Sequence, residues 1–357
     1  MTMQTTVPTG AQTPSGQASY DTLMSRRLAW LVLAALALAA LALADILTGP
    51  AFLNVGDVIR ALFHPAGADP MVRAVVQAIR LPMTLMALIV GASLGLAGAG
   101  MQTILGNPLA SPYTLGFSAA AGFGAAAAIL FGLALPALPQ LTVPAMAFLA
   151  AGAACALVYG LAHLRGASSE VMILAGIATL FLFQSMQSLL QYMAAPEVLQ
   201  EIVFWLFGSL LKATWFSVAV SGAVLALGAG LLARDAWRLT ALRLGDARAQ
   251  SLGINVRALR LRSFATLSLL TAGAVAFVGT IGFVGLVAPH LARMLVGEDQ
   301  RILLPMSALM GALVMCGASI ASKLISPGAV VPIGIVTALI GVPFLFALIL
   351  TRRARHW

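Results

Sequence analysis

The chain has 357 residues, of which 61% are hydrophobic and only 9% are charged. Charged residues make up about a quarter of an ordinary soluble domain, so this composition excludes a soluble globular protein. The formal net charge of +9 does not indicate a nucleic-acid partner, because Arg and Lys collect in the cytoplasmic loops of membrane proteins.

Apolar runs of about 20 residues, each long enough to cross a bilayer as a helix, recur along the sequence. We therefore predict an all-α, polytopic membrane protein with about ten transmembrane helices, some of them broken or half-length. The two cysteines, Cys155 and Cys316, lie inside apolar runs, which favours packing in the core over a disulfide.

The amino-terminal part divides into a tail and the first spans. Residues 1–25 are rich in Thr, Gln, Ser, Gly and Pro, which predicts a disordered cytoplasmic tail. Residues 26–357 are expected to form one transmembrane domain. Its first two spans are predicted at 28–47 and 81–105, on either side of a mixed segment that should lie outside.

Eight further membrane segments follow, and the eighth of the whole series is too short to cross. They are predicted at 114–135, 141–164, 171–193, 215–233, 264–286, 288–295, 303–324 and 332–350. A half-apolar pattern at 194–213 suits an interfacial helix.

A polar loop at 234–263 carries seven arginines. With this threading, fifteen arginines of the chain fall at the predicted inside and three outside. The charge distribution therefore predicts that both termini are cytoplasmic.

Glycine and proline interrupt the second span and the region after residue 278. Gly106, Asn107 and Pro108 end the second span, because proline lacks the donor that continues a helix. The run 279–290 (GTIGFVGLVAPH) is broken in a similar way. We interpret both breaks as hinges beside a transport path, with candidate residues Gly106, Asn107, Pro108, Gly282, Gly285 and Pro289.

A weak internal repeat accompanies the breaks. Aligning Gly98 with Gly279 also places Pro108 on Pro289, and the two segments cross in opposite directions. Inverted repeats with broken helices flank the paths of many transporters.

Ionisable residues are essentially missing from the interiors of the predicted spans two to seven, nine and ten. This pattern argues against an ion-coupled carrier, and no zinc-hydrolase or serine-hydrolase motif indicates a membrane enzyme. A partner would then have to supply energy.

The glutamines, the methionines and the histidine inside the predicted membrane segments could each line a path or have a structural role. Amides facing lipid would be unsatisfied, so the pore candidates are Gln102, Gln184, Gln187 and Gln191. Met101, Met172, Met186 and Met193 could line a path, although core packing is the commoner role. His290 has no second ligand at metal spacing, so we expect a structural role and no metal site.

Within the polar loop, the run 242–253 (LRLGDARAQSLG) has helix-forming residues between glycines. A short helix parallel to the membrane would present such a surface to a soluble partner. The alternative is an ordinary positive-inside loop.

Five sequence blocks together resemble the permease subunits of type II ATP-binding-cassette importers, the FecCD-type family that moves iron(III)-siderophores, haem and cobalamin. The blocks are 79–82 (IRLP), 106–112 (GNPLASP) with 115–116 (LG), 244–253 (LGDARAQSLG), 282–290 (GFVGLVAPH) and 331–343 (VPIGIVTALIGVP). The resemblance spans about residues 28 to 352.

The resemblance implies a ten-helix permease domain that works as a homodimer in the inner (cytoplasmic) membrane of the cell. Two cytoplasmic ATP-binding subunits would bind ATP and Mg, so this chain would be no enzyme and would hold no cofactor. A periplasmic or lipid-anchored substrate-binding protein would deliver the cargo. An iron(III)-siderophore or haem is the expected cargo, cobalamin or another chelate is the alternative within the family, and an ion-coupled secondary transporter is the rival class.

The resemblance also assigns roles to residues. The segment that couples to the ATPase would contain Leu244, Gly245, Asp246, Ala249, Leu252 and Gly253. The cytoplasmic gate would be formed by Ser168, Ser169 and Glu170, where Glu170 departs from the family's small hydroxyl residues.

On the outer face, Arg80 and Lys323 match residues that dock the binding protein, whereas Met83 replaces an arginine that is often present there. The alternative for Arg80 and Lys323 is that they are interfacial anchors whose charged ends reach water.

Overall fold

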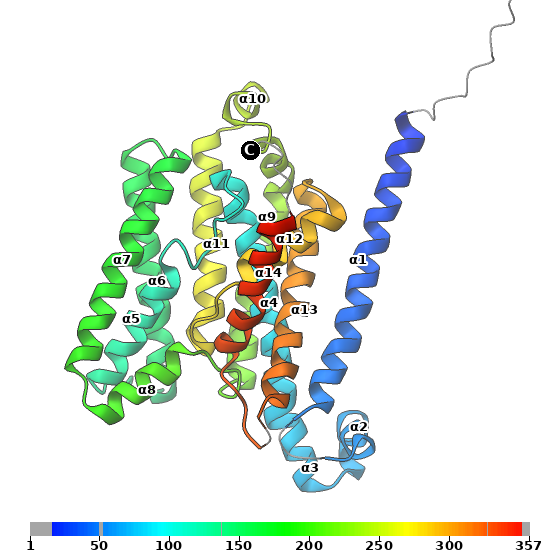
Figure 1. Ribbon diagram of the computed structural model, residues 1–357, viewed down its shortest axis with the longest axis vertical. Coiled ribbons are helices and arrows are strands. Elements are labelled where there is room, and N and C mark those ends of the chain that lie inside the picture. The colour runs from blue at the N-terminus through cyan, green and yellow to red at the C-terminus, as the bar shows by residue number, and fades with distance from the viewer. Residues whose placement is uncertain (1–15, 50–52, 137, 327, 352–357) are drawn as a thin grey trace, which may run out of the picture.

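The structure is a computed structural model that describes residues 16–49, 53–136, 138–326 and 328–351. Within these ranges the regular elements are all helices. Figure 1 shows α10 at one end of the molecule and α8 at the opposite end, and we name the two ends after these helices. The amino-terminal end of α1 and the link between α6 and α7 lie at the α10 end.

Among the described residues, ten helices are candidates for membrane segments, seven of full length and three shorter, and each corresponds to a predicted segment. The long helices are α1 (Gly16–Leu47), α4 (Leu81–Leu105), α6 (Thr142–Leu164), α7 (Ser169–Met193), α9 (Trp215–Leu242), α11 (Val256–Val278) and α13 (Gln300–Leu324). The shorter apolar ones are α5 (Phe117–Leu130), α12 (Val284–Val296) and α14 (Ile333–Thr351).

Short helices make the connections at both ends. They are α2 (Val55–Phe63), α3 (Pro70–Ala74), α8 (Pro196–Leu206) and α10 (Asp246–Ser251), with 3-10 turns at Pro65–Gly67 and Pro139–Leu141 and a π-helical turn at Val75–Arg80. The predicted interfacial helix at 194–213 is α8 followed by a loop.

Helix α4 lies at the centre and packs against α13, α11, α12 and α9. Glycines allow these close approaches, since an added Cβ at Gly98 would lie 1.8 Å from the carbonyl oxygen of Gly285 on α12. Gly91 and Gly311 likewise bring α4 close to α13, since an added Cβ at Gly311 would lie 2.0 Å from the carbonyl oxygen of Gly91. Because packed backbones are hard to displace, α4, α12 and α13 form the rigid core.

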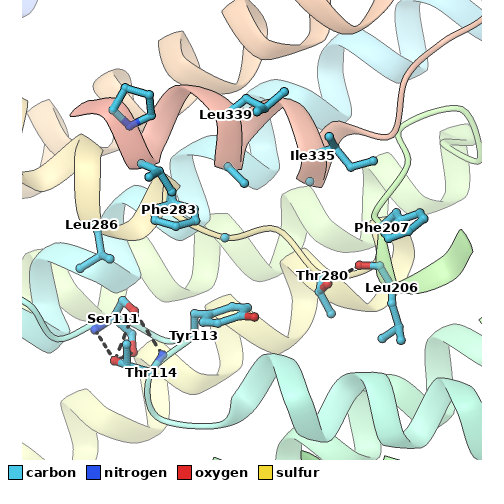
Figure 2. Close-up of a pocket in the computed structure, with 15 residues that line it drawn as sticks. Ser111, Tyr113, Thr114, Leu206, Phe207, Thr280, Phe283, Leu286, Ile335 and Leu339 are labelled. Atoms are coloured by element: carbon cyan, nitrogen blue, oxygen red, sulfur yellow. Dashed lines mark hydrogen bonds between the residues drawn. The ribbon is translucent and has the colours of Figure 1, made fainter. Parts of the chain in front are cut away.

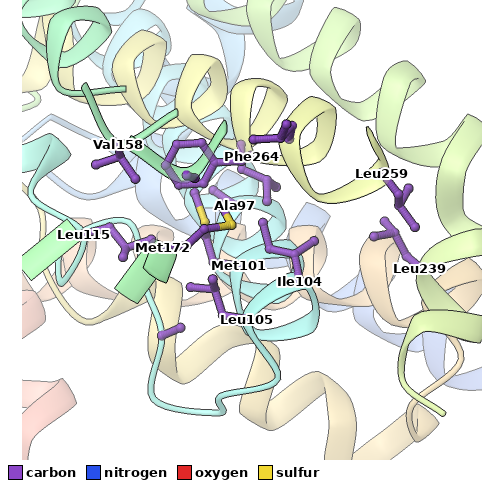
Figure 3. Close-up of a cluster of buried hydrophobic side chains, with 14 of the residues drawn as sticks. Ala97, Met101, Ile104, Leu105, Leu115, Val158, Met172, Leu239, Leu259 and Phe264 are labelled. Atoms are coloured by element: carbon purple, nitrogen blue, oxygen red, sulfur yellow. The ribbon is translucent and has the colours of Figure 1, made fainter. Parts of the chain in front are cut away.

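A second layer of α5, α6 and α7 packs against α4 and α11 through a cluster of buried side chains (Figure 3). Met101 and Met172 are fully buried in this cluster, and the ring of Phe264 lies 5.5 Å from that of Phe117. These two methionines therefore fill the core, whereas Met186 and Met193 are exposed.

The first helix begins at Gly16, inside the segment predicted to be disordered. The side chain of Met24 already packs against a buried cluster that includes Ala34 and Ala292, which explains why helical structure extends past the apolar run. The prediction is therefore wrong for residues 16–25, and residues 1–15 lie outside the described part.

The polar loop predicted at 234–263 is mostly helical, because α9 continues to Leu242 and α11 begins at Val256. Asp235 accepts hydrogen bonds from Arg238 and Arg262, at 2.8 and 2.6 Å. These pairs satisfy charges inside the helices, and only residues 243–255 remain as a connection around α10.

The span predicted at 264–286 is interrupted, because α11 ends at Val278 and α12 starts at Val284. Gly279 and Phe283 have φ of 79° and 67°, which a continuous helix does not allow. Helix α12 consequently has thirteen residues instead of the predicted eight at 288–295.

The two breaks have different local structures. Pro108 lies in a loop after α4, whereas Pro289 lies inside α12, so the aligned prolines of the internal repeat do not occupy equivalent positions. What the two breaks share is that a half-length helix follows each, α5 after the first and α12 after the second.

Candidate functional site

A cavity of about 790 Å³ lies where the two breaks approach α14 (Figure 2). We call it the apolar cavity, because no charged side chain lines it. Its lining is Ser111, Tyr113, Thr114, Leu206, Phe207, Thr280, Gly282, Phe283, Leu286, Gly334, Ile335, Ala338, Leu339, Val342 and Pro343. A concave apolar site with a few polar groups suits a bulky, mostly apolar ligand.

The first break supplies one wall of the apolar cavity. Gly106 ends α4 with φ of 59°, and the side chain of Asn107 accepts a hydrogen bond of 2.9 Å from the amide of Leu109. Ser111 and Thr114 then hold the loop through reciprocal side-chain and backbone bonds. The predicted hinge residues Gly106 and Asn107 therefore shape a tight, hydrogen-bonded turn.

The second break is bonded to the loop after α8 and to the start of α14. The hydroxyl of Thr280 donates to the carbonyl of Leu206, and the amide of Ser209 donates to that of Val278 at 2.7 Å. The amide of Gly334 donates to the carbonyl of Phe207 at 3.0 Å. Three segments that are distant in sequence thus form one unit beside the cavity.

Phe283 is held in a conformation that a bulky residue rarely adopts, with φ of 67°. It lies at the N-cap of α12 and lines the cavity beside α14 (Figure 2). An added Cβ at Gly341 would lie 2.4 Å from the Cβ of Phe283. The absence of a side chain at Gly341 is therefore what leaves room for this ring.

A smaller cavity of about 250 Å³ adjoins the apolar cavity and shares Tyr113, Leu206 and Thr280 with it. Gln184 and Gln187 on α7 line this smaller cavity, and we call it the amide cavity. Gln102 lies elsewhere and accepts a hydrogen bond of 2.9 Å from Arg293, while Gln191 lines neither cavity.

A third cavity, of about 580 Å³, opens at the α10 end. Its lining joins three groups of residues that were predicted separately. It includes Gly106 and Pro108 of the first break, Ser169 and Glu170 of the predicted gate, and Gly245 and Asp246 of the predicted coupling segment. The remaining lining is Thr103, Leu105, Leu242, Arg243, Arg260, Arg293 and Glu298.

The predicted gate link begins helix α7. The hydroxyl of Ser168 accepts from the amide of Val171 at 3.4 Å and caps the helix. Glu170 is exposed in the first turn, where the helix dipole favours a negative charge. Ala167, just before the cap, is buried and has φ of 56°. The departure at Glu170 is therefore compatible with the local helix start.

The predicted coupling segment is the six-residue helix α10, flanked by Gly245 and Gly253 with φ of 99° and 77°. Ala249 is fully buried, whereas Leu244 and Leu252 at the two ends are 56% and 53% exposed. Two exposed leucines that flank a short helix at the end of the molecule suit a partner surface.

Arg80 and Lys323 do not lie where docking residues are needed. Both are buried, at 4% and 5% exposure. Lys323 pairs with Asp45 at 2.8 Å, and Arg80 donates to the carbonyls of Ile46 and Leu47 at 3.0 Å. The prediction of exposed docking residues, and the alternative of anchors reaching water, are both wrong, because these cations bind groups at the end of α1.

Asp45 is the important residue that the sequence interpretation missed. It is fully buried, and the hydroxyl of Thr84 donates to its second carboxylate oxygen at 2.5 Å. A sequence signal existed, because Asp45 is the acidic residue of the apolar run 28–47. Met83, which replaces the expected arginine, is buried among apolar side chains nearby.

Among the described residues, no group of three or more His, Cys, Asp or Glu side chains could hold a metal ion. The ring of His290 packs edge-on against Phe344, with 6.0 Å between centroids. Pro289 is buried inside α12, and Gly285 contacts α4, so both lie behind the cavity wall.

Comparison with known proteins agrees with this geometry. The model of the FecCD transport family matches residues 32–351. An ABC transporter permease, YvrB of Bacillus subtilis, is 38% identical over 341 residues, which cover 93% of this chain and 96% of the relative. The Fe(3+)-citrate import system permease YfmD of the same organism is 33% identical over 333 residues, covering 93% and 97%. The hemin transport system permease HmuU of Yersinia pestis is 35% identical over 280 residues, covering 78% and 84%.

A solved structure described as an inward-facing conformation of a metal-chelate type ABC transporter has the same fold. The TM-score is 0.79 at 33% sequence identity, and the match covers 90% of this chain and 99% of that chain.

Proposed function

Because the chain belongs to the FecCD transport family, we propose that it is the permease subunit of an ATP-driven importer that carries a metal chelate across the inner membrane. The cargo class is an iron(III) chelate or haem, as the names of the ferric-citrate and hemin relatives suggest. The chain makes and breaks no covalent bond. It changes the side of the membrane to which its path opens.

The third cavity, of about 580 Å³ at the α10 end, is the observation that carries this proposal. Its lining contains residues of the proposed coupling segment, of the proposed gate link and of the first helix break. A movement imposed on α10 from the cytoplasm therefore reaches the end of α4 and the start of α7 directly. A permease driven from outside its membrane domain needs such a connection.

The apolar cavity supports a bulky cargo that is enclosed loosely. Its volume of about 790 Å³ lies in the range of ligand sites, and the few polar groups on its wall are hydroxyls. Gln184 and Gln187 in the adjoining cavity would offer amides to the oxygens of a chelate. The absence of charge from the apolar cavity's lining suits a path that must release what it accepts.

A second copy of the chain would complete the path. Exposed apolar residues continue from the cavity wall along α14 and α7, in Leu339, Ile340, Phe346, Leu174, Phe181 and Leu189. We propose that these faces meet in a homodimer, so that the path runs between two subunits related by a two-fold axis.

The other partners follow from the two ends of the molecule. Two ATP-binding subunits would receive α10 and would themselves hold ATP and Mg, and a substrate-binding protein would dock at the α8 end. The excess of arginine near the α10 end supports a cytoplasmic position for that end and for both termini.

An ion-coupled secondary transporter is the second candidate, and the Asp45–Lys323 pair is the feature that such a carrier could use. However, neither residue lines the apolar cavity or the amide cavity. The pair also joins α1 to α13, away from the helix breaks. The observations therefore favour the ATP-driven importer.

Reconstitution tests the proposal. The chain is purified with its ATP-binding subunits and binding protein, and uptake of ferric citrate, a ferric hydroxamate, hemin and cobalamin into proteoliposomes is measured with and without ATP. We expect ATP-dependent uptake of one class, and loss of ATPase association in Leu252→Asp. The matched control is Leu164→Asp, an exposed leucine at the same end. Uptake that needs an ion gradient and no ATPase would overturn the proposal.

A further inference from the structure

Arg260 joins three helices at the α10 end. It lies on α11 with its side chain 8% exposed, and its two terminal nitrogens bind the carboxylate of Asp246 on α10 at 2.7 and 2.8 Å. Its remaining nitrogen, Nε, donates to the carbonyl oxygen of Ile104 on α4 at 2.9 Å. The rigid fork of a guanidinium therefore fixes the distance between α10 and α4.

The Ile104 carbonyl belongs to the last turn of α4, where carbonyls have no partner within the helix. Arg260 thus completes the end of α4 as well as the start of α10. A residue needed only to hold α10 would have no use for this second contact. Arg262, two positions further along α11, differs from Arg260: its side chain is 47% exposed, and it binds Asp235 on α9.

A second chain of contacts reaches the same turn of α4 from the other side of α10. Arg243, which precedes the coupling segment, binds Glu298 at 2.7 Å, and Glu298 lies 3.1 Å from Nε of Arg293. Arg293 in turn donates to the side chain of Gln102 on α4 at 2.9 Å. Both flanks of α10 are therefore tied to the last turn of α4.

From that turn, rigid contacts lead to the apolar cavity. Helix α4 meets α12 at Gly98 and Gly285, where the backbones touch. Phe283 caps the start of helix α12, and its ring lines the cavity together with Gly282 and Thr280 of the second break. A displacement of α4 along its axis would therefore move the start of α12.

We infer that Arg260 is a positioning residue that transmits movement of α10 to the last turn of α4, and from there to the broken helix at the apolar cavity. This inference rests on the proposed function, because it assumes that an ATPase moves α10. The ratio of cargo transported to ATP hydrolysed measures this energetic coupling directly.

Arg260→Lys is the informative variant, because a lysine keeps the charge but cannot bind Asp246 with two nitrogens and Ile104 with a third. In proteoliposomes we expect the cargo molecules transported per ATP hydrolysed to fall on the order of tenfold. Association with the ATPase and the unfolding temperature should stay close to wild type. Arg262→Lys is the matched control, with the same substitution and a similar ion pair, and it should transport normally.

A double-mutant cycle tests whether Arg260 and Asp246 act as one unit. Asp246→Asn and Arg260→Lys should each lower the transport-to-hydrolysis ratio, and the double variant should be no worse than the poorer single variant. Asp246→Asn combined with Arg262→Lys should give additive effects.

Each result has a definite meaning. If Arg260→Lys transports with the wild-type ratio, or if its ratio falls only in parallel with ATPase association, the inference is wrong. If the wild-type complex itself shows no ATP-dependent uptake, the proposed function fails instead, and the two failures are therefore distinguishable.

Discussion

The ammonium of Lys323 lies 2.8 Å from the carboxylate of Asp45, although the two residues are 278 positions apart in the sequence. The pair is almost wholly enclosed, since the two side chains are 1% and 0% exposed. It joins the end of α1 to the end of α13, and the Thr84 hydroxyl extends it to α4. The pair therefore holds an otherwise lipid-exposed helix against the core.

Removing one member of this pair should be much worse than removing both. Asp45→Asn leaves a buried ammonium without its counter-charge, and breaking such a pair costs about 3 to 5 kcal/mol. The double variant Asp45→Leu with Lys323→Met replaces the ions by apolar groups and should recover most of that loss. Thermal unfolding in detergent, followed by size-exclusion chromatography, measures both. A double variant less stable than Asp45→Asn would contradict this account.

Hydrophobic patterning was sufficient to locate the ten apolar helices that are candidate membrane segments in the described part of the chain, because the bilayer requires long apolar runs with internally satisfied backbones. The positions of the two breaks were also predictable, since glycine and proline change the local backbone. Gly106 and Gly279 both have positive φ where the sequence indicated a break.

Partners of charged residues were not predictable in the same way. The sequence around Lys323 and Arg80 does not distinguish a side chain that faces water from one that binds a polar group on another helix. The packing of α1 decides this, because Lys323 binds Asp45 and Arg80 binds the carbonyl of Leu47. The same holds for Arg260, one of seven arginines in a segment whose charge balance indicated topology alone. Tertiary contacts, which span up to 278 residues here, carry that information.

Gly98→Ala tests the contact between α4 and α12. Alanine is favoured over glycine in a helix by up to about 1 kcal/mol, but the new Cβ would lie 1.8 Å from the Gly285 oxygen. Separating the helices should cost about 1 to 3 kcal/mol or more, so we expect a net loss of stability. Gly230→Ala on α9 is the control, because nothing lies within 4 Å of its added Cβ. Equal unfolding temperatures for the two variants would refute the close contact.

Asp299 caps α13 and gives a prediction about pH. Arg301 donates to this carboxylate, which holds the pKa of Asp299 below its ordinary value. Its stabilisation is therefore fully present above the ordinary carboxyl pKa of about 3.9 and is lost as the pH falls through the lowered folded value.

We expect Asp299→Ala to destabilise the protein by about 1 kcal/mol through loss of the cap. The deficit should be the same at pH 5 and pH 8, and should shrink only below about pH 4. Unfolding temperatures of both proteins across this range provide the measurement. A deficit that changes between pH 5 and pH 8 would mean that another group titrates with folding.

Gly341 and Phe283 test whether the apolar cavity is the transport path. In Gly341→Ala the new Cβ would lie 2.4 Å from the Phe283 Cβ, and the ring belongs to a residue whose φ of 67° leaves it little freedom. Overpacking of about 1 to 3 kcal/mol should therefore displace Phe283 into the cavity or push α14 away. We expect ATP-dependent uptake of the accepted chelate to fall several-fold while the complex still assembles.

The double variant Gly341→Ala with Phe283→Gly removes both the Cβ and the ring of residue 283, so it relieves the contact and should transport better than Gly341→Ala alone, which loss of stability at either site would not produce. Gly317→Ala on α13 is the control, since its added Cβ has nothing within 4 Å. If Gly341→Ala assembles and transports like wild type, this wall of the cavity does not limit passage of the cargo. The path would then run along the amide cavity beside Gln184 and Gln187, whose lining does not include Phe283.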